Sequence, residues 1–285
     1  MQDSTVEVLY HAVPVAQRQR LYLFRASHPY QHLDVGGVRW EYISSGQGES
    51  TVLVLGGGMS LGETSFRTIQ RLESRFRVIS PSYPPVGKVR PVVDGLAAIL
   101  DKEGITQAHL MGHSLGSGVG HVFVRLLPER VDRLVLDGFG LYTPGHVRLA
   151  RLFFMLPYRW LLAYYQHVLD RLVSSDPEEG VFYRAYLTDV LTRLHTRETL
   201  IGQFKMLIDL FDRGGEYGVF RPVERPGKVL LILADDDRGF SPQERQALKD
   251  SYPGARVHTF TSGGHMAGFS RREEFDAVVD RFLDG

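Results

Sequence analysis

Apolar residues occur along this chain in short continuous runs that alternate with longer stretches of helical periodicity. The predicted strands cover residues 51–55, 77–80, 108–111, 134–136 and 228–233. The segment 51–55 is a continuous apolar run, as expected of a central strand buried on both faces. Stretches with apolar residues three or four positions apart separate the predicted strands. This alternation predicts an α/β fold, with a mostly parallel twisted sheet flanked by helices.

The first part of the chain follows a different pattern. In residues 1–30 only Leu21–Phe24, beside several arginines, indicates a short helix lying on the body of the protein. Two extended pieces follow, 33–35 and 38–42, and the Gly36-Gly37 pair between them predicts an antiparallel hairpin. We therefore expect an N-terminal extension at 1–30 and a core that begins at residue 31.

The strand–helix rhythm stops between about Leu141 and Pro226. Three helical stretches rich in aromatic residues occupy this region, and the acidic sequence 176–179 is expected to cap the second of them. We predict a helical cap, or lid, at 143–225, inserted into a core formed by 31–142 and 226–285. Its aromatic residues and Met155 are expected to form mostly the interior of the cap, with a minority lining an apolar acyl pocket.

Two sequences near the C-terminus resemble capping boxes, in which a serine and a glutamate three residues later satisfy the first N–H groups of a helix. Ser241 with Glu244, and a proline between them, predicts a helix start after the strand 228–233. Ser270 with Glu273 predicts the start of the terminal helix.

Composition narrows the function classes. The 285 residues include 33 basic and 33 acidic side chains, so charge gives no argument for nucleic acid or an anionic membrane. The chain has no cysteine, which removes disulfides, thiolate chemistry and cysteine-based zinc sites. No stretch reaches the roughly 20 apolar residues of a membrane span, and the first ten residues lack an apolar signal core. We expect a soluble, cytoplasmic protein.

The strongest motif is Gly112-His113-Ser114-Leu115-Gly116, at the junction of the apolar run 108–111 and a helical pattern. A serine on such a tight strand-to-helix turn is forced into a strained backbone conformation, and the glycines leave room for the turn. The turn exposes the hydroxyl, which makes Ser114 the candidate nucleophile. A G-x-S-x-G sequence also arises by chance, so the assignment of a nucleophile requires a candidate base and a candidate acid elsewhere in the chain.

A glycine-rich dinucleotide loop is the alternative interpretation of this segment. Gly116, Gly118 and Gly120 begin a helix, and a strand that ends at Asp137 follows them. Their spacing does not match G-x-G-x-x-G, so we predict no cofactor.

A serine nucleophile needs a base and an acid, and in this topology they follow it in the order acid, histidine. His265 comes after Gly264 in the loop that follows the last predicted strand, 256–259, so it is the candidate base. Asp237, the outermost of three aspartates after the strand 228–233, is the candidate acid. Asp236 and Asp137 remain alternatives, whereas Asp235 is expected to belong to a solvated turn that caps the next helix.

Backbone N–H groups complete the candidate site. Leu115 follows the serine at a helix N-terminus, where its N–H faces a developing oxyanion. Gly58, or alternatively Met59, lies after the strand 51–55 and is the expected second donor. The histidines are scattered and no H-E-x-x-H pair occurs, so we predict no metal site. His113 is expected to pack in the elbow and His121 to lie on a helix surface.

These features resemble the α/β-hydrolase superfamily over residues 31–285. A looser resemblance links the segments 24–29, 77–84 and 252–256 to the maspardin branch of that superfamily. Many members carry His-Gly where this chain has Gly56-Gly57, and some maspardin-like proteins lack a complete triad, whereas all three positions are filled here. The resemblance implies a catalytically competent hydrolase.

The sequence therefore predicts a serine hydrolase that acts by acyl transfer on a small ester-like substrate. Carboxylic esters are the first expectation, and thioester, amide and carbon–carbon bonds stay open because one triad serves them all. A non-catalytic binding protein that uses the surface of the lid is the alternative from another class, and a nucleotide-binding oxidoreductase is a third.

Overall fold

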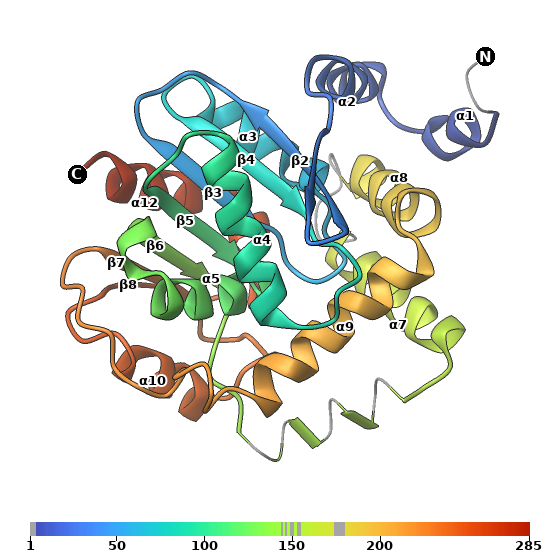
Figure 1. Cartoon of the computed structure of the whole chain (residues 1–285). Coiled ribbons are helices and arrows are strands. Elements are labelled where there is room, and N and C mark those ends of the chain that lie inside the picture. Colours follow the sequence, from blue (N-terminus) through green and yellow to red (C-terminus); the bar gives the residue numbers. More distant parts are fainter. Residues whose placement is uncertain (1–3, 144, 146, 149–150, 153–154, 174–179) are drawn as a thin grey trace.

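The structure is a computed structural model that describes residues 4–143, 145, 147–148, 151–152, 155–173 and 180–285. Its centre is an eight-stranded sheet with the strand order β1-β2-β4-β3-β5-β6-β7-β8 (Figure 1). The strands are β1 (Gln31–Val35), β2 (Val38–Ser45), β3 (Thr51–Leu55), β4 (Arg77–Ser82), β5 (Ala108–His113), β6 (Val131–Asp137), β7 (Val229–Ala234) and β8 (Arg256–Phe260). The β1–β2 and β2–β4 pairs are antiparallel and the others parallel, which confirms the predicted fold class.

Helices cover both faces of the sheet. Figure 1 shows α4 (Val89–Lys102) and α5 (Leu115–Leu126) in front of it, with α3 (Phe66–Leu72) and α12 (Arg272–Asp284) behind. Every residue of β3 and β7 is buried, which explains why their sequences are continuous apolar runs. Because parallel strands end at one edge, the loops after β3, β5 and β7 meet there.

The N-terminal residues form two helices, α1 (Ser4–Tyr10) and α2 (Val15–Ser27). Helix α2 is longer than the short helix predicted at Leu21–Phe24, and it buries Leu21 and Phe24 against the body. The predicted hairpin is confirmed: Gly36 and Gly37 both have positive φ, at 59° and 79°, as a tight turn between two twisted strands requires.

Between β6 and β7 the chain leaves the sheet. The inserted helices are α7 (Tyr158–Val173), α8 (Gly180–Asp189) and α9 (Arg197–Asp212), and a short π-helical turn, η3 (Val190–Leu194), follows α8. Phe182 and Tyr186 are buried as expected, but Met155 is 80% exposed and Trp160 56%. The expectation of a mostly interior role is therefore wrong for those two residues. The predicted cap at 176–179 lies outside the described residues.

One of the two capping boxes is confirmed. Ser241 and Glu244 cap α10 (Pro242–Asp250) reciprocally. The prediction for Ser270 is wrong, because Ser270 ends a separate helical turn, α11 (Ala267–Ser270), and the N-cap residue of α12 is Arg271. The three remaining short turns are 3₁₀-helical: η1 (Gly62–Ser65), η2 (Pro128–Arg130) and η4 (Gly264–Met266).

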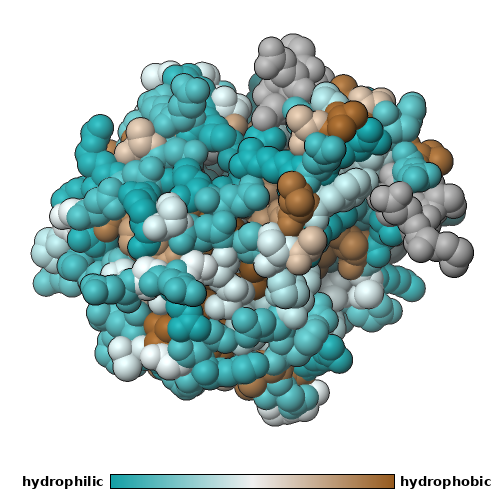
Figure 2. Space-filling model, turned by 90° about the horizontal axis from the view of Figure 1, so that it is seen from above, coloured by the Kyte–Doolittle hydropathy of each residue, from teal (hydrophilic) through white to brown (hydrophobic). Residues whose placement is uncertain are grey.

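The face of the molecule shown in Figure 2 is largely hydrophilic, with apolar groups that are separated from one another. Among the described residues, no helix combines the length and apolar character needed to cross a bilayer. Within the same part of the chain, no group of three or more histidine, aspartate or glutamate side chains is arranged to bind a metal ion.

Candidate functional site

The sharp turn between β5 and α5 carries Ser114. Its backbone has φ 50° and ψ −115°, a conformation that non-glycine residues rarely adopt. A Cβ on Gly112 would lie 2.6 Å from the backbone of Gly116, and a Cβ on Gly116 would lie 2.1 Å from the Leu55 carbonyl oxygen. Both glycines of the motif are thus explained by close backbone approach. The Ser114 N–H donates to the Asp137 carbonyl at 2.9 Å, which holds the turn in place.

The structure brings Ser114, His265 and Asp237 into one chain of hydrogen bonds. His265 Nε2 lies 2.9 Å from Ser114 Oγ, and His265 Nδ1 lies 3.1 Å from Asp237 Oδ2. When Nδ1 carries the proton and donates it to the carboxylate, Nε2 is free to accept the proton of the serine hydroxyl. Loops after three separate strands supply the three side chains.

The carboxylate of Asp237 is held in its charged form. Burial favours the neutral acid, but the hydrogen bond and charge of His265, the Gly239 N–H and Arg245 outweigh it, so the pKa of Asp237 lies below its usual value. Gly239 N donates to Asp237 Oδ1 at 2.7 Å. A Cβ on Gly239 would lie 3.0 Å from that oxygen and 3.2 Å from His265 Nδ1, so a larger residue would crowd both groups.

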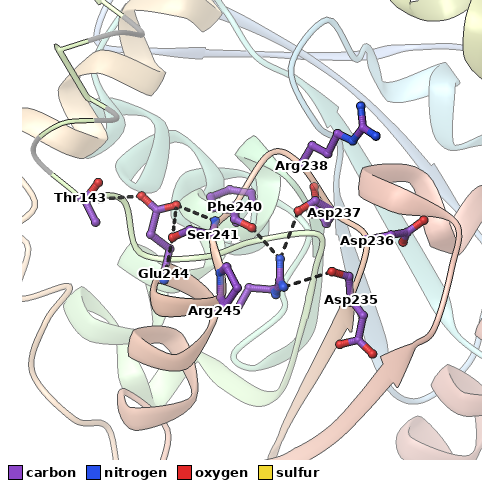
Figure 3. A pocket seen from close by; sticks show the side chains of 10 residues that line it. Thr143, Asp235, Asp236, Asp237, Arg238, Phe240, Ser241, Glu244 and Arg245 are labelled. Atoms are coloured by element: carbon purple, nitrogen blue, oxygen red, sulfur yellow. Dashed lines mark hydrogen bonds between the residues drawn. The ribbon is translucent and has the colours of Figure 1, made fainter.

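Arg245 fixes the loop that carries this acid. As Figure 3 shows, its guanidinium points into the loop and donates to the carbonyl oxygens of Asp235, Asp237 and Phe240. A cavity of about 610 Å³ lies on this side of the loop, lined also by Thr143 and the start of α10. Ser114 is not among its lining residues, so this cavity is separate from the serine.

The two neighbouring aspartates contact other groups. The carboxylate of Asp236 accepts the N–H groups of Gly263 at 3.2 Å and Gly264 at 2.8 Å, and it therefore holds the loop that precedes His265. Asp235 is exposed in a turn, as expected, but the expectation that this turn caps α10 is wrong, because the N-cap of α10 is Ser241.

Asp137, the more distant alternative acid, pairs with a different histidine. Its Oδ2 lies 2.7 Å from His113 Nδ1. Burial lowers the pKa of His113, but the charge and hydrogen bond of Asp137 and the charge of Asp237 raise it more, so the net shift is upward. The ring of His113 lies 5.4 Å from that of His265. His113 does belong to the packing of the elbow, as expected.

His121 departs from the expectation of a surface residue. It is fully buried and bonds to the Val219 carbonyl and the Tyr252 hydroxyl, at 3.0 and 2.8 Å. Burial, together with the charge of Arg125, lowers its pKa well below the usual value. A neutral, buried imidazole with a hydrogen bond at each ring nitrogen is part of the core.

The loop after β3 lies against the serine. A Cβ on Gly57 would come within 3.4 Å of Ser114 Cβ, and a Cβ on Gly58 would meet no atom within 4 Å. Leu115 is the first residue of α5, so its N–H has no partner within the helix. Met59 has a positive φ of 66°, and its N–H donates to the Gln203 side chain at 2.5 Å. Of the two candidate oxyanion donors, Met59 therefore has its N–H bound by Gln203, whereas the N–H of Gly58 is not bound by that side chain.

Four residues that hold this site together were not predicted from the sequence: Gly239, Arg245, His195 and Gln203. Asp237-Arg238-Gly239 carries a local signal, because an aspartate often accepts the N–H two residues later in a turn. His195 and Gln203 contact the loop after β3 from 136 and 144 residues away, and nothing in the local sequence of either indicates this.

Comparison with known proteins is consistent with this architecture. The chain matches the model of the alpha/beta hydrolase family over residues 52–278, from β3 to α12. It belongs to the alpha/beta hydrolase family. The matched segment of this α/β hydrolase contains Ser114, Asp237 and His265.

Curated relatives match most of this α/β hydrolase. It is 28% identical to the dihydrolipoyllysine-residue acetyltransferase component of the acetoin cleaving system of Cupriavidus necator, over 91% of this chain and 70% of the relative. It is 27% identical to the 2-hydroxy-6-oxononadienedioate/2-hydroxy-6-oxononatrienedioate hydrolase of Escherichia coli, over 86% of this chain and 91% of the relative.

Solved structures share the fold of this α/β hydrolase. A hydrolase from Pseudomonas aeruginosa superposes with a TM-score of 0.73 at 19% identity, over 90% of this chain and 99% of the other. The enol-lactonase from Burkholderia xenovorans superposes with a TM-score of 0.67 at 18% identity, over 90% of this chain and all of the other.

Proposed function

We propose that this α/β hydrolase is a serine hydrolase that acts by acyl transfer on a small carboxylic ester. The observation that supports the proposal most directly is the hydrogen-bond chain from Ser114 Oγ through His265 to Asp237. Such a chain is the arrangement that turns a weakly nucleophilic hydroxyl into an effective nucleophile.

In the proposed reaction, His265 Nε2 takes the Ser114 proton while Oγ forms a bond to the ester carbonyl carbon. The carbonyl oxygen becomes an oxyanion that the N–H groups of Leu115 and Gly58 stabilise. The imidazolium then returns the proton to the leaving alcohol as the C–O bond breaks, which leaves an acyl-enzyme. Water, activated by the same imidazole, attacks the acyl carbon, and Ser114 is released together with the carboxylic acid.

Asp237 has two roles in this scheme. Its carboxylate keeps the Nδ1 proton in place, so that Nε2 faces the serine, and it stabilises the imidazolium formed in each half-reaction. The depressed pKa of Asp237 keeps the carboxylate charged over the working range of an imidazole base. The inserted helices α7, α8 and α9 are proposed to form a lid that limits the access of water and substrate.

Carbon–carbon bond hydrolysis is the second candidate, because a relative of this chain is named as a 2-hydroxy-6-oxononadienedioate hydrolase. The same serine, base and oxyanion donors serve acyl transfer from carbon as well as from oxygen. A non-catalytic binding protein, the alternative from another class, would not require an imidazole within hydrogen-bond distance of the serine.

The replacement Ser114→Ala tests the proposal. Wild-type protein is expected to hydrolyse p-nitrophenyl acetate, and the variant should lose about 10³-fold or more in kcat because no acyl-enzyme can form. A fluorophosphonate probe should label wild type at Ser114 and leave the variant unlabelled. An unreactive serine in a folded wild-type protein would support the binding protein instead.

A vinylogous 1,5-diketone, assayed beside the acetate ester, separates the two bond types. A kcat/KM for the diketone far above that for the ester would identify carbon–carbon hydrolysis as the main activity, with the serine role retained. An unchanged rate in Ser114→Ala on both substrates would refute the assignment of the nucleophile.

A further inference from the structure

The loop between β3 and η1 is held from two sides. From the core side, the Tyr83 hydroxyl donates to the Gly56 carbonyl at 3.1 Å, where the loop begins. A tight turn follows, in which Ser60 N donates to the Gly57 carbonyl at 3.2 Å. Met59 lies inside this turn with its positive φ of 66°, a conformation that a methionine does not adopt without support from its surroundings.

That support comes from the inserted helices. The Gln203 amide accepts the Met59 N–H at 2.5 Å and donates to the Ser60 carbonyl at 3.1 Å. His195 donates from Nε2 to the Met59 carbonyl at 2.8 Å. Two side chains therefore bind three backbone polar groups of the consecutive residues Met59 and Ser60.

Both side chains are suited to a fixed geometry. Gln203 is 1% exposed and His195 is 8% exposed, so water does not compete strongly for their hydrogen bonds. Burial lowers the pKa of His195, although its bond to the Met59 carbonyl raises it in part. The imidazole is then neutral with its proton on Nε2, and its Nδ1 accepts from the Thr199 hydroxyl at 3.1 Å.

Helix α9 is itself fixed to the core. The Asp209 carboxylate accepts the Val89 N–H at 2.9 Å, at the start of α4, and Gly202 lies so close to Pro85 that a Cβ would approach the Pro85 backbone to 2.7 Å. Gln203 adjoins this close contact. The position of its amide is thus set by packing against the loop after β4 and not only by its own rotamer.

From this arrangement we propose that Gln203 and His195 are positioning residues, which hold the turn 57–60 so that the Gly58 N–H faces the oxyanion. The inference rests on the proposed function, in which Gly58 is an oxyanion donor. Because Gln203 engages the Met59 N–H, the flanking peptide groups are fixed and the Gly58 N–H keeps one direction. A shift of the inserted helices that breaks these bonds would release the turn and lower turnover.

The decisive variant is Gln203→Met, which keeps the volume of the side chain and removes both of its hydrogen bonds to the turn. The expected result is a 10- to 100-fold fall in kcat for p-nitrophenyl acetate, with KM changed less than about threefold, because the oxyanion forms only in the transition state. The inhibition constant of phenylboronic acid, which forms a tetrahedral adduct with a serine, should rise by a similar factor.

Tyr186→Phe is the matched control. The Tyr186 hydroxyl is buried and donates to the Glu63 carbonyl at 2.9 Å, so it also joins an inserted helix to the segment after β3, but outside the turn 57–60. Its loss should leave kcat and the phenylboronic acid inhibition constant within about twofold of wild type. Equal kinetic effects of the two variants would overturn the positioning role.

A further variant keeps the test decisive if Gln203→Met does not fold, as judged by circular dichroism and thermal melting. His195→Leu removes the bond to the Met59 carbonyl and, outside the turn, the bond to the Thr199 hydroxyl, and it should lower kcat in the same selective manner. A folded His195→Leu protein with wild-type kcat would then refute the proposal.

Ser114→Ala is measured in parallel, to separate the positioning role from the proposed function. If Ser114→Ala keeps wild-type activity, the proposed function itself fails. If Ser114→Ala is inactive and Gln203→Met has wild-type kinetics, only the positioning role is rejected.

Discussion

Three consecutive aspartates after β7 carry the same carboxylate but have different contacts. Asp237 is buried against His265, Asp236 binds the backbone of the loop that precedes His265, and Asp235 is exposed. The chain turns directly after Ala234, the last residue of β7, where the Asp237 N–H donates to the Ala234 carbonyl, and this turn separates the three side chains. One charge in three is therefore in contact with the imidazole.

Conversion of each aspartate to asparagine should separate these roles. Asp237→Asn is expected to lower kcat by about 10³- to 10⁴-fold, because the amide no longer fixes the Nδ1 proton or stabilises the imidazolium. Asp236→Asn should cost less than about tenfold, since an amide oxygen still accepts one of the two glycine N–H groups. Asp235→Asn serves as the control with unchanged kcat. Ester hydrolysis at pH 7 provides the measurement, and a larger loss in Asp236→Asn than in Asp237→Asn would contradict the assignment.

At the scale of single residues, the sequence predicted those site residues that lie in a short local motif or follow a fixed order along the chain. The G-x-S-x-G motif predicted Ser114 as the nucleophile, and chain order together with the outermost position of Asp237 predicted Asp237 and His265 as its partners, with Asp236 and Asp137 as alternatives. The structure places Ser114, His265 and Asp237 in one chain of hydrogen bonds. The choice between Gly58 and Met59 could not be made from the sequence. It depends on Gln203, which is 144 residues away from Met59 and reaches it only after the inserted helices have packed.

At the scale of elements, the strands were predicted best. β3 and β7 are buried at every residue, so their sequences are continuous apolar runs. β5 is also buried except at its last residue, although His109 interrupts its apolar residues. The terminal helix was harder, because the chain makes the extra turn α11 before it, and the serine of the apparent capping box belongs to that turn. Trp160 and Tyr164 of α7 are 56% and 49% exposed, although the aromatic residues of the insertion were predicted to be mostly interior. Aromatic content alone does not show which face of a helix is covered.

Helix α4 illustrates how packing overrides helix propensity. Gly95 lies in its interior, where alanine would ordinarily stabilise the helix by about 1 kcal/mol. A Cβ at this position, however, would lie 2.1 Å from the Trp40 ring, which is 1% exposed. Gly95→Ala is therefore expected to lower the free energy of unfolding by roughly 1–3 kcal/mol, as measured in urea.

The double variant Trp40→Phe/Gly95→Ala provides the control for this prediction. The smaller ring vacates part of the space that the new methyl group needs, so the two changes should be less destabilising together than their separate effects would sum to. Additive effects, or a stabilised Gly95→Ala protein, would show that the ring does not limit residue 95.

At the scale of the whole molecule, a buried ionic cluster joins three distant parts of the chain. Arg25 of α2 binds Glu63 of η1 at 2.6 Å and Asp189 of α8 at 3.0 Å. The Asp189 carboxylate, which is fully buried, also binds the Tyr10 hydroxyl at 3.0 Å and Arg193 at 2.6 Å. The N-terminal helices are thus attached both to the core and to the inserted helices.

Removal of the central cation should weaken this attachment. Arg25→Met is expected to lower the free energy of unfolding by roughly 3 kcal/mol, because two carboxylates that are largely shielded from water lose a partner. Arg90→Met, which breaks the exposed pair between Arg90 and Asp94, is the control and should change it by less than about 1 kcal/mol. Urea titration measures both. Equal effects of the two changes would show that the cluster adds no more than a surface pair.

The order of the sheet also has a consequence for how copies of this protein meet. Its outer strands, β1 and β8, have one side each without a neighbouring strand in the sheet. Most of the side chains they expose to solvent are polar, among them Gln31, His32 and Asp34 on β1 and Arg256 on β8, whereas Val257 of β8 is apolar and 46% exposed. Polar and charged borders of this kind disfavour edge-to-edge pairing, which protects a concentrated solution of the protein against growth of intermolecular β-structure.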